Sequence, residues 1–169
     1  MTPFTNACAT LMVRELRALG AELDLFPDDE MPWKTAPGVT NSAANLALHV
    51  AGNLQHFVGA VLGSTGYVRN RDLEFSRASG SRAEVKQELE SAIRAVEETL
   101  PRLTADILAA DYPLKMIEGK RIETALYLHH LCSHASFHLG QAGYARRVLT
   151  GDKRSAGPLS LLAIMSDRD

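Results

Sequence analysis

The sequence predicts an all-α fold, and three features of the chain support this prediction. Long stretches carry apolar residues at every third or fourth position, which is the spacing of an amphipathic helix. No stretch shows the regular apolar–polar alternation of a half-buried strand. The chain of 169 residues is long enough to bury a sizeable core in one domain. We therefore expect residues 1–169 to form a single four-helix bundle.

The first predicted helix covers residues 1–21, and its apolar spacing continues as far as Pro27. Thr2 and Pro3 are typical of a helix start, because proline is tolerated in the first turn. An acidic loop that contains two prolines follows, and Trp33 lies within it. We expect Trp33 to cover the core or to form the wall of a pocket.

The second predicted helix covers residues 39–62, with Thr40 or Asn41 as its N-cap. His49 falls on or beside its apolar face. His56 follows seven residues later and points in nearly the same direction, but ~10 Å further along the helix axis. Because of this separation, we expect that His49 and His56 cannot share one ion.

The third predicted helix begins after a glycine-containing connection, residues 63–80. Within this connection, charges of alternating sign in Arg69–Phe75 suggest local ion pairs, and we expect a structural or dimer-facing segment. Ser81 and Glu84 have the spacing of a capping box, in which each side chain accepts from a free backbone amide of the first turn. Pro101 is expected to end or kink the helix.

The last long helix is predicted over residues 122–149 and ends at Gly151. Before it, residues 104–108 suit a short helical turn, and residues 115–121 a hairpin-like excursion. After it, the apolar tail at residues 156–165 is expected to dock on the core of its own chain or on a second subunit.

Charge and composition exclude several classes of protein. The formal net charge of −2 leaves no basic excess to neutralise nucleic-acid phosphates or an anionic membrane. Cys8 and Cys132 are too few and too far apart for a disulfide framework, which favours a reduced, intracellular setting. The N-terminus lacks the features of a signal peptide, and no apolar run is long enough to cross a bilayer. We therefore expect a soluble cytoplasmic protein.

The stretch from His130 to Gln141 carries the strongest signal of chemistry. His130, His134 and His138 repeat every four residues, so on a helix their side chains share one face, roughly 6 Å apart. Buried imidazoles need polar partners, and one shared metal ion would satisfy two of them. His134 and His138 have the spacing of a helical metal site, and His49 is the candidate third ligand from a facing helix. Ordinary core hydrogen bonds are the alternative.

Five neighbouring residues have two possible roles each, or a purely structural one. Gln141 and Asn53 could hydrogen-bond a ligand imidazole or a bound water, or they could pack between helices. Tyr127 could border the site or lie in the core. His130 is expected to donate a hydrogen bond to the ligands or to line the pocket rather than to bind the ion. Cys132 lies about 160° from His134 around the helix, and we expect it to behave as a small apolar residue.

Two motifs resemble the DinB/YfiT-like superfamily: Asn-Leu-Ala-Leu-His-Val-Ala-Gly-Asn at residues 45–53, and His-Ala-Ser-Phe-His-Leu-Gly-Gln at residues 134–141. The resemblance covers roughly residues 5–151, and the Arg69–Phe75 segment is typical of one branch. The resemblance implies a homodimeric four-helix bundle with a histidine triad that binds a divalent metal ion of the zinc, nickel or iron type. The triad residues that it implies are His49, His134 and His138.

The resemblance also implies candidate functions. Some members are similar to transferases that use a low-molecular-weight thiol such as bacillithiol or mycothiol, and others to metal-dependent hydrolases or isomerases. We therefore expect a metal-dependent transferase that acts on small electrophiles. The alternatives are a metal-dependent hydrolase and a non-catalytic bundle, metal-binding or metal-free, with a role in stress response or protein interaction. No acid/base residue is evident on the histidine face.

Overall fold

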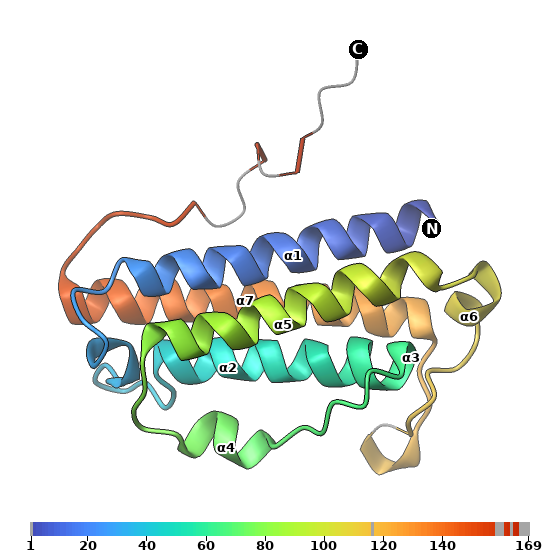
Figure 1. The fold of residues 1–169 in the computed structure, drawn as a ribbon, viewed down its shortest axis with the longest axis horizontal. Coiled ribbons are helices and arrows are strands. Elements are labelled where there is room, and N and C mark those ends of the chain that lie inside the picture. Colours follow the sequence, from blue (N-terminus) through green and yellow to red (C-terminus); the bar gives the residue numbers. More distant parts are fainter. Residues whose placement is uncertain (1, 116, 158–160, 163, 166–169) are drawn as a thin grey trace.

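The computed structural model describes residues 2–115, 117–157, 161–162 and 164–165 (Figure 1). The regular secondary structure of these residues consists of helices, without a strand; an isolated antiparallel bridge joins Asp111 and Glu123. The predicted all-α class is therefore confirmed. Every helix among these residues falls short of the length and apolar character that a membrane span requires.

Four long helices make up the body of the molecule: α1 (Pro3–Asp24), α2 (Ala43–Leu54), α5 (Arg82–Thr99) and α7 (Thr124–Thr150). They lie side by side, and α1 and α2 each pack against both α5 and α7 (Figure 1). The core lies between them because each helix turns its apolar face inward. Fully buried leucines from these helices include Leu16, Leu19, Leu54, Leu128 and Leu131.

Local capping signals fix most of the helix ends, as predicted. Thr2 caps α1 with Pro3 in the first turn. Ser81 and Glu84 form the predicted capping box of α5. The last helix ends at Gly151, whose φ of 67° is a left-handed conformation that glycine adopts without strain.

The shorter elements follow the predicted order with one change. A 3-10 turn at Leu100–Arg102 ends α5, and α6 (Ala105–Ala109) is the predicted short helix. In place of the hairpin-like excursion, a 3-10 turn covers Ile117–Gly119. The docking predicted for the apolar tail falls partly on residues 158–160 and 163, which lie outside the described residues.

The second helix differs from its prediction at both ends. It begins at Ala43 with Ser42 as N-cap, not Thr40 or Asn41, and the Ser42 hydroxyl accepts from the Asn45 amide at 3.2 Å. After Leu54 the backbone forms a π-helical turn, Gln55–Ala60, before the short helix α3 (Val61–Gly63). A π-helical turn is wider than an α-helical turn, so it shifts the helical register of the residues that follow it.

The connection that follows is not a plain loop. It contains the helix α4 (Arg71–Ser76), capped by the Asn70 side chain, and α4 packs against α2. Trp33, in a 3-10 turn (Met31–Trp33), is buried in the core, and its indole N–H donates to the Gly80 carbonyl at 2.7 Å. Trp33 therefore covers the core and also anchors the end of this connection.

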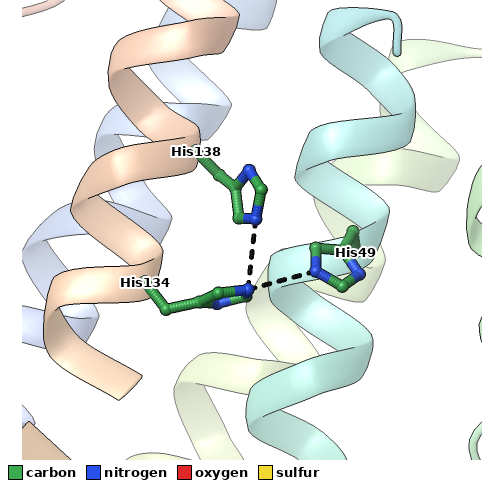
Figure 2. Close-up of side chains that lie close together, drawn as sticks. All are labelled: His49, His134 and His138. Carbon is green, nitrogen blue, oxygen red and sulfur yellow. Dashed lines mark hydrogen bonds between the residues drawn. The ribbon is translucent and has the colours of Figure 1, made fainter. Parts of the chain in front are cut away.

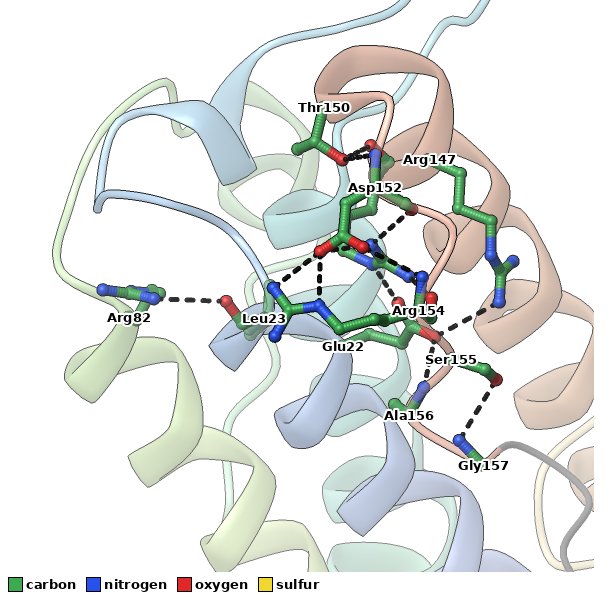
Figure 3. Close-up of polar contacts among 11 residues, drawn as sticks. Glu22, Leu23, Arg82, Arg147, Thr150, Asp152, Arg154, Ser155, Ala156 and Gly157 are labelled. Atoms are coloured by element: carbon green, nitrogen blue, oxygen red, sulfur yellow. Dashed lines mark hydrogen bonds and ion pairs between the residues drawn. The ribbon is translucent and has the colours of Figure 1, made fainter.

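A buried ion pair joins α1 to the end of α7. Arg146 is 0% exposed and its Nε donates to Glu22 Oε2 at 2.5 Å. Figure 3 shows Glu22 beside Asp152, Arg154 and Ala156 of the segment that follows α7. The Arg146 guanidinium also donates to the backbone carbonyls of Asp152 and Arg154, and the Ala156 amide donates to Glu22 Oε1 at 3.3 Å. The pair therefore fixes the chain after Gly151 against α1 and α7.

We expect Arg146→Leu to lower the free energy of unfolding by about 3–5 kcal/mol, because it leaves the Glu22 carboxylate buried without its partner. Arg147→Leu is the matched control. Its side chain is 30% exposed and 3.8 Å from Glu22, so a loss of no more than about 1 kcal/mol is expected. Urea denaturation of both variants measures the difference, and equal stability of the two would contradict this role for Arg146.

Candidate metal centre

Three histidines from two helices meet at one point. His49 comes from α2, and His134 and His138 come from adjacent turns of α7 (Figure 2). His134 Nε2 lies 3.2 Å from His49 Nε2 and 3.1 Å from His138 Nε2. The possible ligand atoms of the three side chains all lie within 4.8 Å of one another. The structure thus brings together the three histidines that the sequence singled out, in an arrangement that could hold a metal ion.

The site lies at the edge of the core. His49 is 6% exposed, whereas His134 and His138 are half-buried. The four-residue spacing puts the two α7 histidines on one face, and the packing of α2 against α7 brings His49 to meet them. The site is therefore anchored in the core at His49 and accessible from solvent on the α7 side.

Hydrogen bonds at the far ring nitrogens assign the tautomers of two histidines. Two groups lie near His49 Nδ1, Arg69 Nη2 at 3.2 Å and Glu74 Oε2 at 2.9 Å; the closer carboxylate can only accept, so His49 Nδ1–H donates to it. His138 Nδ1–H donates to Gln141 Oε1 at 2.7 Å. Both Nε2 atoms then carry lone pairs that face His134 Nε2. A single N–H on His134 can donate to only one of them, so at least one close pair of nitrogens lacks a proton between them. A cation shared by the three nitrogens would remove this conflict, and the residues therefore fit a divalent metal ion.

Burial keeps the two α7 imidazoles neutral. It lowers the pKa of His134 to about 3, with a further contribution from the neighbouring His138, His49 and His130. Burial also lowers the pKa of His138, although the hydrogen bond to Gln141 opposes the shift. Neutral imidazole is the form that binds a metal ion, so near neutral pH neither α7 histidine needs to lose a proton first.

Glu74, on α4, connects the triad to an ion pair. Arg69 donates from Nε to Glu74 Oε1 at 2.7 Å and from Nη2 to Glu74 Oε2 at 2.8 Å. Burial alone would raise the pKa of Glu74, but hydrogen bonds from Arg69 and His49 hold it below its usual value. The carboxylate is therefore ionised and fixes the His49 ring, while Arg69 offsets its charge.

Two residues of α2, Asn45 and Gly52, determine how Glu74 lies against this helix. The Asn45 side-chain amide donates to the carbonyls of Glu74 and Arg77 at 2.9 and 2.8 Å, which ties α4 to the first turn of α2. Gly52 lies one turn after His49, and a Cβ atom there would come within 2.2 Å of Glu74 Oε1. The absence of a side chain at Gly52 therefore lets the carboxylate lie against α2.

The other candidate residues do not contact the converging nitrogens. Tyr127 packs in the core against Phe57, and burial raises its pKa to about 12. His130 is exposed, with its ring centre 6.1 Å from that of His134. Asn53 is buried away from the ligands, and the Cys132 thiol lies against the Cys8 carbonyl in the core. Of the predicted neighbours, Gln141 alone binds a triad imidazole among the described residues.

Sequence reasoning missed Glu74, Arg69 and Gly52 as parts of the site. The alternating charges of Arg69–Phe75 were a signal, but we interpreted them as local ion pairs. The predicted local ion pair does form between Arg69 and Glu74, and the Glu74 carboxylate also reaches a histidine 25 residues away in the chain. The Arg69–Phe75 segment is thus not merely structural.

Comparison with known proteins gave one family. The model of a family described as "Protein of unknown function (DUF1572)" matches residues 3–159. A search of the curated proteins gave no match.

We expect Gly52→Ala to displace the Glu74 carboxylate and to lower the free energy of unfolding by about 1–3 kcal/mol. In the NMR spectrum, the hydrogen-bonded His49 Nδ1–H resonance should shift or disappear. Gly140→Ala on α7 is the matched control, because a Cβ there meets no atom within 4 Å. That control should be neutral or stabilising by up to about 1 kcal/mol and should leave the resonance unchanged. An unchanged resonance in Gly52→Ala would refute the role of Gly52.

Proposed function

We propose that this chain, which belongs to the DUF1572 family, binds one divalent metal ion through His49, His134 and His138 and acts as a thiol-dependent transferase. The observation that carries the proposal is the convergence of three Nε2 atoms, two of them with lone pairs fixed by partners at Nδ1. Zinc, nickel and iron all favour such a set of neutral imidazoles, so the choice among them stays open.

The protein residues hold and tune the site. His49, His134 and His138 would supply the three ligand nitrogens, and Glu74 fixes the ring of His49. Because Arg69 offsets the charge of Glu74, the surroundings of the triad add little net negative charge. When bound, a divalent ion would lower the pKa of a thiol or water molecule that reaches it and so supply a nucleophile near neutral pH. The half-buried α7 side leaves a route for that molecule.

A thiol suits this site better than water does. The side chains that hydrogen-bond the triad from outside, Glu74 and Gln141, are both engaged in fixing ligand rings. Among the described residues no free carboxylate, lysine or tyrosine hydrogen-bonds a triad imidazole. A thiol, with a pKa near 8.5, needs less assistance to lose its proton than water, with a pKa of about 15.7. The lack of a free base also favours a second candidate, a non-catalytic metal-binding protein. A metal-dependent hydrolase fits the site less well, because it would have to activate water without such a base.

The resemblance to the DinB/YfiT-like superfamily supports the same proposal. The mutual packing of α1, α2, α5 and α7 is consistent with the four-helix bundle of that superfamily. We further propose that residues 1–169 form one domain in the cytoplasm, and that two copies form a homodimer. The exposed tail side chains Leu161, Leu162 and Met165 are candidates for the contact between them.

We expect wild-type protein, purified without a nickel column, to contain about one equivalent of zinc, nickel or iron by elemental analysis. His134→Ala should lose this metal, because two imidazoles remain. His129→Ala is the matched control from the exposed side of the same helix and should keep it. Wild-type protein that contains no metal, even after zinc, nickel and iron are added back, would sink the proposal.

We expect metal-loaded wild-type protein to accelerate the reaction of bacillithiol or mycothiol with 1-chloro-2,4-dinitrobenzene. In this reaction a carbon–sulfur bond forms, chloride leaves and the thiol proton passes to solvent. His134→Ala should react at the uncatalysed rate and His129→Ala at the wild-type rate, both followed by absorbance. Full metal occupancy without acceleration by either thiol would favour the non-catalytic candidate.

A further inference from the structure

An apolar cavity of about 310 Å³ lies beside the histidine triad, between the start of α2 and the end of α7. Its walls include Leu46 and Ala145, which are buried, and Val39, Tyr144 and Val148, which are 41%, 73% and 64% exposed. Large apolar side chains exposed together on a soluble protein commonly mark a binding site. A larger cavity of about 560 Å³ lies along α1; the three histidines line neither cavity, but only the smaller one is lined by Gln141, the hydrogen-bond partner of His138.

The cavity adjoins the triad through two residues. Gln141, which accepts from His138 at 2.7 Å, also lines the cavity and lies one turn after His138 on α7. Leu46 lines it from α2, one turn before His49. A molecule in the cavity therefore contacts α2 one turn before His49 and α7 one turn after His138.

The residues that line the cavity indicate what kind of molecule it binds. The described residues that line the cavity include no charged side chain. Its polar groups are uncharged hydroxyls and amides, such as those of Thr40, Asn41 and Gln141, and the other walls are mainly apolar. The volume is at the small end of the range for ligand pockets, about 300–1,000 Å³. An aromatic ring or a short alkyl chain fits both the size and the polarity.

We propose that this cavity binds the apolar group of the electrophilic substrate and so selects electrophiles with an uncharged aromatic or alkyl substituent. This inference rests on the proposed function, because it assigns the reacting end of the molecule to the triad. The apolar group in the cavity and the reactive centre at the histidines would then lie about one helical turn apart, roughly 5–6 Å.

Benzyl mercaptan is a suitable probe, because its sulfur can reach the triad while its ring occupies the cavity. In cobalt-substituted protein, sulfur binding gives a charge-transfer band, and 2-mercaptoethanol provides the same sulfur without a ring. We expect benzyl mercaptan to bind at least ~10-fold more tightly than 2-mercaptoethanol. Equal affinities in the wild type would overturn the inference.

Two variants test whether the ring lies in the cavity. Ala145→Leu fills it from within, and Val148→Phe narrows it from the exposed rim, where misfolding is not expected. Both should remove the preference for benzyl mercaptan and leave 2-mercaptoethanol binding unchanged. Leu126→Phe is the matched control on the same helix, because Leu126 is 59% exposed and does not line the cavity. A preference that survives both cavity variants would overturn the inference.

A titration of metal-free protein separates this inference from the proposed function. Benzyl mercaptan should shift the NMR methyl resonances of Val39, Leu46 and Val148 whether or not metal is present. Methyl shifts without a cobalt band would support the cavity and refute the metal site. A cobalt band without methyl shifts would support the metal site and overturn the inference.

Discussion

The packing of α2 against α7 is the contact on which the candidate site depends. It brings His49 within 3.2 Å of His134, although 85 residues separate them in the chain. Several buried alanines lie on the two helices, among them Ala47 on α2 and Ala135 and Ala142 on α7, all at most 1% exposed. Since interiors are densely packed, a larger side chain between α2 and α7 would separate the helices and move the imidazoles apart.

A second set of contacts orients what the helix packing brings together. The Nε2 lone pairs of His49 and His138 both face His134 Nε2, so these rings need partners that hold them in place. Glu74 and Gln141 supply that constraint at the nitrogens that point away from the centre. Such outer hydrogen bonds fix ring orientation and make the ligand nitrogen more basic. The outer hydrogen bonds therefore direct the Nε2 lone pairs of His49 and His138 toward the centre of the triad, where a cation would lie.

Much of the fold could be predicted because local signals determine it. Helix starts at Thr2 and Ser81, and the end at Gly151, depend on residues within a few positions of one another. The pair His134 and His138 follows from helical period alone. In each case the signal and the structure lie within one or two turns of chain.

The remainder depends on contacts between distant segments, which a single sequence does not display. Three polar residues in a row could have capped α2, and the contact of Asn45 with the α4 carbonyls favours the start after Ser42. His49 could be named as a candidate from its place on the apolar side of another helix, but its 3.2 Å approach to His134 depends on packing between distant segments. Glu74 carries no local sign that its partner is a histidine on another helix. The π-helical turn at Gln55–Ala60 likewise has no simple sequence signature.

Glu74 lies outside the two helices that carry the three histidines. The residue that orients His49 lies on α4, a short helix attached to the outside of the long helices (Figure 1). The three histidines belong to the long helices α2 and α7, whereas α4 lies in a connection, and connections tolerate sequence change better than the elements they join. Substitutions in this connection therefore alter the hydrogen bond at His49 Nδ1 and leave the three histidines themselves in place. For protein engineering, residues 69–76 are thus the segment in which to vary the surroundings of the histidines.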